Sequence, residues 1–267
     1  MTKEHSTFNI QHPTPKYRGD APPLDVGRPA WNVECLFLCN SGKCSAAFNM
    51  ALDEVLLDAV SRLGKPVLRF YGWTETAATF GYFQKYADVE RATLLRPLIR
   101  RPTGGGIVPH DADWTYSLVF PPGHEWHSLK AEASYRRVHE WIQAAFAQLK
   151  IETELAPCCR KAESGKQKAD IPSACFIGYE KSDLLWRGKK IAGAAQRRNK
   201  FGLLIQGSVQ PPLEQIARMG WENAMQEAAR RQFQVEWREW SPDESLQAHV
   251  AELARRKYSQ DDYNRKR

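Results

Sequence analysis

Three successive glycines follow a pair of arginines near the middle of the chain, in the stretch Arg100–Gly106 (RRPTGGG). Glycine loses more conformational entropy on ordering than any other residue, so neither a helix nor a strand interior accounts for such a run. The run suits a sharp bend, positive φ or a close approach to backbone N–H groups. With the arginines it predicts a nest for a carboxylate, a phosphate or an acyl carbonyl oxygen. A glycine-rich hairpin with solvent-facing arginines is the alternative, and the common phosphate-loop patterns are absent.

The composition is typical of a folded globular chain. With 267 residues, 42% apolar and 11% aromatic, the chain can bury the core of one large domain or of one domain with a small appendage. No run of eighteen apolar residues occurs, so we expect no membrane span, and the polar N-terminus does not read as a signal peptide. Six unevenly placed cysteines predict no disulfide framework, and we expect a cytoplasmic protein.

The charge balance favours acidic partners. The net charge is +7, from 38 basic and 31 acidic residues, and a basic surface attracts nucleic acid or an acidic protein. No helix-turn-helix, RNA-binding aromatic signature or zinc finger is present, so we do not expect nucleic acid as the partner.

Hydrophobic periodicity predicts an α+β fold. Helices are expected at residues 48–63, 131–149 and 243–256, with Gly64 ending the first. Asp53 and Glu54 lie in the early turns of the first helix, where acidic side chains suit its positive end. Short runs bounded by Gly, Pro and Asp are typical of strands, with a turn at 41–45. These runs are 31–38, 67–71, 78–83, 98–101, 114–120, 151–155, 174–177, 184–186, 191–195 and 203–209.

The chain divides into three regions by composition. Residues 1–30 carry five prolines and few large apolar residues, which predicts a flexible N-terminal arm. Residues 31–210 form the strand-rich core. Residues 211–267 read as a helical C-terminal extension of the same domain, with a break at 241–242.

Metal binding is not expected from the cysteine and histidine spacings. Cys35, Cys39 and Cys44 fit neither zinc nor iron–sulfur patterns, and the vicinal pair 158–159 has no partner pair nearby. The stretch 124–127 (HEWH) is too short for a metalloprotease motif, and we expect a surface loop there.

Two residues beyond the lysine-rich loop 161–168 carry candidate chemistry. Neighbouring cations would stabilise the thiolate of Cys175 and make it a nucleophile, although a buried, small apolar role is the alternative. Lys190 precedes a small apolar run, Ile191-Ala192-Gly193. Burying its stem would place the ammonium at a strand end, where it can serve an anionic or polarised group.

Ordered short motifs match one family of catalytic domains. They are residues 47–54 (AFNMALDE), 68–73 (LRFYGW), 81–84 (GYFQ), 100–105 with 110–111, 115–117, 175–176, 190–197 (KIAGAAQR), 207–208 and 257–258. On these motifs the sequence resembles the lipoate/biotin protein ligase–octanoyltransferase catalytic-domain family. Within that family it is most similar to the octanoyl-[acyl carrier protein]:protein octanoyltransferases with a loop cysteine. The resemblance runs from about residue 34 to the end and implies a mixed β-sheet packed with helices and a small helical C-terminal part.

The resemblance also implies roles for individual residues. Cys175 would take the octanoyl or lipoyl group from a carrier-protein thioester as an acyl-enzyme, and an acceptor lysine would release it as an amide. Lys190 would orient the acyl carbonyl and stabilise its oxyanion. Phe80, Tyr71 and Tyr82 are candidates for the wall of the acyl-chain tunnel. The full expected substrate-binding set is Arg101, Gly104, Gly105, Gly106, His110, Tyr71, Tyr82, Gly193 and Gln206.

The resemblance implies protein partners and no cofactor. The donor would be octanoyl-acyl carrier protein, and the acceptor a lipoyl-domain protein such as the glycine cleavage H protein or a 2-oxoacid dehydrogenase E2. No metal, nucleic acid or membrane is expected, and we expect a monomer. In the alternative of a lipoate–protein ligase, ATP and Mg would be needed to form a lipoyl-adenylate. A non-catalytic acyl-binding paralogue is the third hypothesis.

Two departures from the family pattern concern proton transfer. Gln206 stands where a histidine is common, so another base would be needed if that histidine assists catalysis. Pro109 precedes His110 and could shift it. We expect His110 to orient the loop through backbone hydrogen bonds rather than to act in catalysis.

Overall fold

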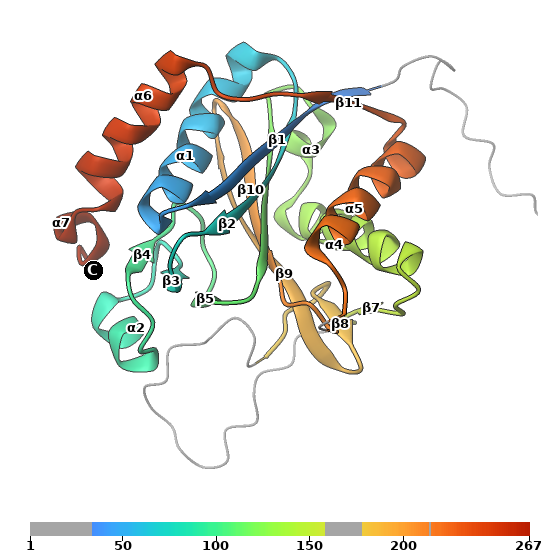
Figure 1. Cartoon of the computed structure of the whole chain (residues 1–267), viewed down its shortest axis with the longest axis horizontal. Helices are drawn as coiled ribbons and strands as arrows, with labels where there is room; N and C mark the ends of the chain where they lie inside the picture. Colours follow the sequence, from blue (N-terminus) through green and yellow to red (C-terminus); the bar gives the residue numbers. More distant parts are fainter. Residues whose placement is uncertain (1–33, 158–177, 214) are drawn as a thin grey trace, which may run out of the picture. The chain divides into compact units, whose positions relative to one another are not determined.

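A mixed eight-stranded sheet organises the chain in the computed structural model, which describes residues 34–157, 178–213 and 215–267 (Figure 1). β1 is parallel to both of its neighbours, β11 and β2, and every other pair in the sheet is antiparallel. The strand order is β11 (Val235–Glu239), β1 (Glu34–Cys44), β2 (Val67–Trp73), β6 (Trp114–Phe120), β10 (Gly202–Val209), β9 (Lys189–Asn199), β8 (Leu184–Trp186) and β7 (Glu154–Leu155).

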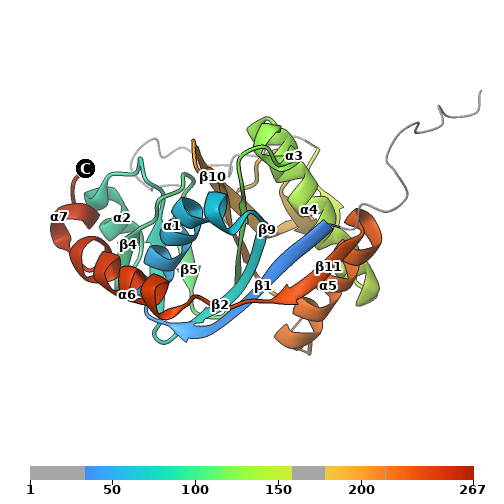
Figure 2. The ribbon, with the colours of Figure 1, turned by 90° about the horizontal axis from the view of Figure 1, so that it is seen from above.

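Helices cover both faces of this sheet (Figure 2). α1 (Ala46–Leu63) packs on one face with α6 (Glu244–Leu253) beside it, and α4 (Ala131–Gln148) and α5 (Arg218–Phe233) pack on the other. The central strands β6 and β10 are buried along their whole length, as expected of strands covered on both sides. The predicted α+β fold is confirmed.

The first helix shows why its sequence folds as predicted. Ser45 caps the N-terminus by accepting a hydrogen bond from the N–H of Phe48 at 3.3 Å. Gly64 ends the helix in the left-handed region at φ +65°, and its N–H donates to the Val60 carbonyl. The helix 131–149 and the strand 114–120 are likewise confirmed.

A second, three-stranded sheet holds the glycine run. Its central strand β3 (Ala77–Phe80) is parallel to β4 (Leu98–Arg100) and antiparallel to β5 (Val108–His110). The glycines form the connection from β4 to β5, and α2 (Tyr86–Ala92) lies between β3 and β4 in the chain. The run is therefore a loop between two strands that share a neighbour, and not a hairpin.

Several local predictions differ from the structure. β1 continues to Cys44 through the predicted turn at 41–45, and the stretch 124–127 contains a short helix, α3 (Glu125–Ser128), whose Trp126 is buried. The C-terminal part is helical as predicted, with η1 (Ala254–Tyr258) and α7 (Asp261–Asn264), but β11 was not predicted. The predicted strand 174–177 lies outside the described residues. No helix of the described chain has the length and apolar character needed to cross a membrane.

Candidate active site

A cavity opens between the glycine loop and the buried face of the large sheet. Seven of the residues predicted to act on substrate line it: Tyr71, Arg101, Gly105, His110, Lys190, Gly193 and Gln206. The other lining residues are Met50, Thr79, Val108, Thr115, Ala194, Ala195, Gly207 and Ser208. Residues distant in the sequence thus meet at one concave site, the usual form of a small-molecule site.

Lys190 reaches this cavity from the start of β9. Its ammonium lies 2.7 Å from the Asp183 carboxylate, and both side chains are 8% exposed. The lysine folds over Gly193, where a Cβ would come within 2.6 Å of its Cε and 2.8 Å of its Nζ. The lysine head thus occupies the space of a side chain at position 193, and a larger residue there would require the lysine to move.

Arg101 shapes the glycine loop from the inside. Its guanidinium donates to the Gly104 carbonyl at 3.1 and 2.6 Å and to the Gly106 carbonyl at 2.7 Å. Gly105 between them adopts φ +87°, a conformation that favours glycine. The predicted nest is thus partly filled by the protein, because Arg101 bonds the loop's own carbonyls.

Arg100 corrects the prediction that both arginines face an anion. It is fully buried, and its guanidinium donates to the backbone carbonyls of Tyr82, Gln84 and Asn264 at 2.7 to 3.2 Å. Successive residues of a strand point to opposite sides. Arg100 therefore anchors α7 while Arg101 faces the cavity.

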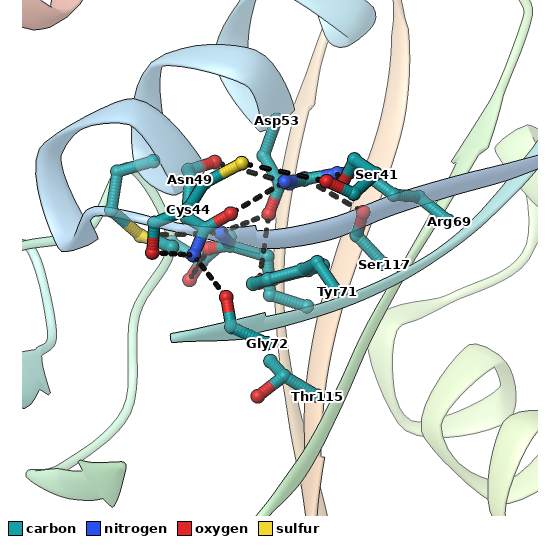
Figure 3. A network of polar contacts seen from close by, with 12 residues as sticks. Ser41, Cys44, Asn49, Asp53, Arg69, Tyr71, Gly72, Thr115 and Ser117 are labelled. Atoms are coloured by element: carbon teal, nitrogen blue, oxygen red, sulfur yellow. Dashed lines mark hydrogen bonds and ion pairs between the residues drawn. The ribbon is translucent and has the colours of Figure 1, made fainter. Parts of the chain in front are cut away.

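A buried carboxylate, Asp53 on α1, joins the helix to the sheet (Figure 3). Its oxygens accept hydrogen bonds from Arg69 at 2.6 Å, Ser117 at 2.7 Å and Tyr71 at 3.1 Å. Gln206 adds a fourth at 2.7 Å. Burial and this carboxylate raise the pKa of Tyr71 well above its ordinary value, so the phenol stays a donor. The sequence had suggested that Asp53 stabilises the positive end of the helix. In the structure it instead bonds residues of the sheet.

Gln206 occupies a structural position inside this network. Its amide oxygen accepts a hydrogen bond from the Thr103 hydroxyl at 2.7 Å while its nitrogen donates to Asp53. The strand residue therefore connects the threonine that precedes the three glycines to the first helix. An amide suits this place because it donates to one neighbour and accepts from the other.

A second buried carboxylate, Asp113, organises the other end of the cavity. It accepts hydrogen bonds from His110 at 2.9 Å, Thr115 at 3.0 Å and Ser208 at 2.7 Å. The register of β6 and β10 pairs Ser208 with Thr115 and Gln206 with Ser117. Each carboxylate is thus held by one polar residue from each strand, all on one buried face.

His110 bonds side chains, which corrects the expectation of backbone partners. Its Nε2 lies 2.8 Å from the Thr79 hydroxyl, and its ring stacks on Trp73 at 3.7 Å. Arg101 donates to the same hydroxyl at 3.3 Å, and the other ring nitrogen of His110, Nδ1, lies 2.9 Å from the Asp113 carboxylate. Its acid partner is Asp113, whereas the adjacent Asp111 is exposed.

The remaining predicted residues have different outcomes. Gly104 and Gly106 hold Arg101 through their carbonyls. Tyr82 is not among the cavity residues, and its ring instead packs under the ammonium of Lys266 at 4.1 Å. Cys175, like the pair 158–159, lies outside the described residues.

Sequence reasoning did not single out Asp53, Asp113 or Asp183 as parts of the site. A signal exists for Asp113, because it opens a strand whose polar residues alternate on one face. Metal ligation is not indicated: among the described residues no group of three or more His, Cys, Asp or Glu could hold a metal ion.

Comparison with known proteins places these features in a family. Residues 45–256 match the model of the lipoyl protein ligase A/B catalytic domain. The octanoyltransferase LipM of Macrococcus caseolyticus is 36% identical over 181 residues, which cover 66% of this chain and 65% of that protein. The octanoyltransferase LipM of Lysinibacillus sphaericus is 34% identical over 199 residues, which cover 73% of this chain and 72% of that protein. The chain thus spans just under two thirds of the length of the Macrococcus relative.

The solved structures agree on the fold. A putative lipoate protein ligase from T. acidophilum with bound lipoic acid superposes with a TM-score of 0.68 at 20% identity. The superposition covers 88% of this chain and 99% of that one. At this identity the likeness establishes the architecture alone. The family match over most of the chain settles the assignment: this chain belongs to the lipoyl protein ligase A/B catalytic domain family.

Proposed function

We propose that this protein transfers an octanoyl or lipoyl group from an acyl carrier protein thioester to the lysine of a lipoyl-domain protein. The observation that carries the proposal is Lys190, whose ammonium lies over Gly193 at a cavity with apolar walls. A fixed cation beside an apolar slot suits a substrate with a polar carbonyl on an aliphatic chain. The relatives named octanoyltransferase support the choice of acyl group.

The proposed reaction has two acyl transfers. The Cys175 thiol gives up its proton and the thiolate attacks the thioester carbonyl of octanoyl-acyl carrier protein; the bond to the carrier's sulfur breaks, and that sulfur takes up the proton and leaves as a thiol. The acceptor lysine's amine then attacks the acyl-cysteine, forming an amide and returning the cysteine thiol. Lys190 donates a hydrogen bond to the oxyanion in both steps. Thioester exchange is close to neutral in free energy and aminolysis is downhill, so neither ATP nor Mg is required.

The cavity has separate residues for the two parts of the proposed substrate, its aliphatic chain and its carbonyl group. Met50, Tyr71, Val108 and the alanines 194–195 would contact the aliphatic chain, while Lys190 holds its carbonyl. Phe80 and Tyr82, expected as tunnel walls, do not line the cavity. Phe80 packs in a separate apolar cluster with Tyr86 and Val89 of α2. An acidic acceptor, such as the glycine cleavage H protein or an E2 lipoyl domain, would complement the net charge of +7.

The test is the intact mass of the protein after incubation with octanoyl-acyl carrier protein without ATP, beside Cys175→Ala and Lys190→Met. We expect one hydroxylamine-sensitive octanoyl adduct on the wild type, none on Cys175→Ala and slow formation on Lys190→Met. Transfer to a lipoyl domain only when ATP and free octanoate or lipoate are present would identify a ligase instead. Absence of both reactions would identify an acyl-binding paralogue.

A further inference from the structure

We propose that Asp183 is a positioning residue of the active site, whose carboxylate fixes the Lys190 ammonium over Gly193 so that its N–H groups face the cavity. The reaction-level part of this inference rests on the proposed acyl transfer. The geometric part, that Asp183 sets the direction of the Lys190 ammonium, stands by itself.

The geometry around the pair leaves the lysine little freedom. Asp183 immediately precedes β8, and Lys190 lies near the start of β9, the next strand along the chain and its neighbour in the sheet. One carboxylate oxygen of Asp183 takes the ammonium at 2.7 Å and the backbone N–H of Glu180, also at 2.7 Å. The carboxylate is therefore itself held by the loop before β8, and it lies 3.6 Å from the Cβ position of Gly193.

The groups packed behind Asp183 make Lys190 its counter-ion. From α4, His139 is fully buried and its Nδ1 bonds the Ser182 carbonyl at 2.7 Å. Burial lowers the pKa of His139 to about 4, so the ring is neutral at physiological pH. From β6, Tyr116 is fully buried, and burial raises its pKa, so it stays a neutral phenol. Among the residues that the structure describes, the cation that forms an ion pair with Asp183 is Lys190, at 2.7 Å.

Substitution of Asp183 should change the position of the Lys190 ammonium while the lysine itself stays in the site. Each torsion of the lysine stem has several staggered minima, so the Asp183 carboxylate at 2.7 Å helps to fix the direction of the ammonium. Misplacement of a catalytic group by about 1 Å can cost about 100-fold in rate. Asp183→Asn keeps the size and one acceptor but loses the charge, while Asp183→Glu keeps the charge.

The experiment is a double-mutant cycle in acyl transfer with Asp183→Asn, Lys190→Met and the double variant, plus Asp183→Glu. We expect Asp183→Asn to lower kcat about 100-fold with little change in KM, Asp183→Glu to recover part of the loss, and Asp183→Asn to add little in the Lys190→Met background. A loss of the same size in both backgrounds would overturn the proposal, because Asp183 would then act without Lys190. Glu132→Gln, which breaks the exposed pair with Lys181, is the matched control and should leave kcat unchanged.

A second readout does not depend on the protein being a transferase. The rate at which an amine-acylating reagent labels Lys190 is followed over time by peptide mass spectrometry in the full-length protein. Without the carboxylate the ammonium loses its ion-pair partner at 2.7 Å, so labelling of Asp183→Asn should be several times faster. Identical labelling curves for the wild type and Asp183→Asn would refute the pairing, whereas absence of transfer with altered labelling would refute only the proposed function.

Discussion

Replacing Gly81 by alanine tests the fit between the glycine loop and the strand beneath it. A Cβ at this position would meet the Gly105 carbonyl oxygen at 2.0 Å and carbons of the same loop at 2.9 Å. Ordinary contact begins at 3.4 Å, and the atoms that the Cβ would meet are backbone atoms, so the loop must move away. Overpacking of this kind costs about 1–3 kcal/mol.

The displaced loop should also weaken the bonds that Arg101 makes to it. Its carbonyls at Gly104 and Gly106 accept from the guanidinium at 2.6 and 2.7 Å, and hydrogen bonds to a charged group are worth about 1.5–3 kcal/mol. If part of this hydrogen-bond energy is lost in addition to the cost of the clash, the free energy of unfolding should fall by about 2–4 kcal/mol in total. For a domain of this size that lowers Tm by about 5–15 °C. Because the loop lines the cavity, kcat should fall by about 100-fold.

The matched control is Gly104→Ala in the same loop. A Cβ there meets nothing within 4 Å, and the backbone of Gly104 is not in the left-handed region. Thermal unfolding followed by circular dichroism should give a Tm close to wild type for Gly104→Ala and a clear drop for Gly81→Ala. If Gly81→Ala unfolds at the wild-type temperature and retains activity, the close packing of loop on strand is wrong.

Three further variants address buried polar groups, each followed by urea unfolding. Gln206→Leu removes a donor from buried Asp53 and should cost about 1–3 kcal/mol; an unchanged midpoint would count against the bridge. Burial raises the pKa of Glu54, but hydrogen bonds from Lys257 and its neighbours outweigh this and lower it. The stability it contributes is thus present above pH 4.5 and lost as pH falls through the lower folded value, a loss that Glu54→Gln should abolish. Burial lowers the pKa of His139 from 6.5 to about 4, so only the unfolded chain binds a proton in this window. Stability should drop by about 3 kcal/mol as pH falls from 6.5 to 4, and His139→Gln should flatten that decline.

The elements predicted well are those whose local signals agree with their burial. The first helix has its apolar period, its serine cap and its terminal Gly64, and its observed bounds differ from prediction by two residues at one end. Strands 114–120 and 203–209 were predicted as short runs between turn residues, and both are buried along their whole length because both of their faces are covered. Strand β11 (VEWRE) carries three charges and only one buried residue, so its place beside β1 depends on a long-range pairing that no local pattern reports.

The sequence predicted several residues of the site but not the carboxylates that bind them. Lys190 and Arg101 were found from their unusual neighbours in the sequence and Gly193 from the family resemblance, and all three line the cavity. Their carboxylate partners were missed because pairing depends on register and strand order. Asp183 reaches Lys190 only because β8 and β9 are adjacent and antiparallel, and Asp113 rather than Asp111 meets His110 because of the way the chain enters β6.

The adjacent arginines Arg100 and Arg101 both stabilise the glycine loop, but they do so on opposite sides of the strand that precedes it. Arg101 grips the loop carbonyls from the cavity, while Arg100 ties the same strand to Asn264 near the end of the chain. Thr103, between them and the glycines, donates to Gln206 on the large sheet. The partners of Arg100 and Thr103 come from different elements, α7 and β10, so loss of one of these anchors leaves the other in place. A flexible sequence is thereby fixed before substrate arrives, and preorganisation of this kind is what stabilisation of an oxyanion requires.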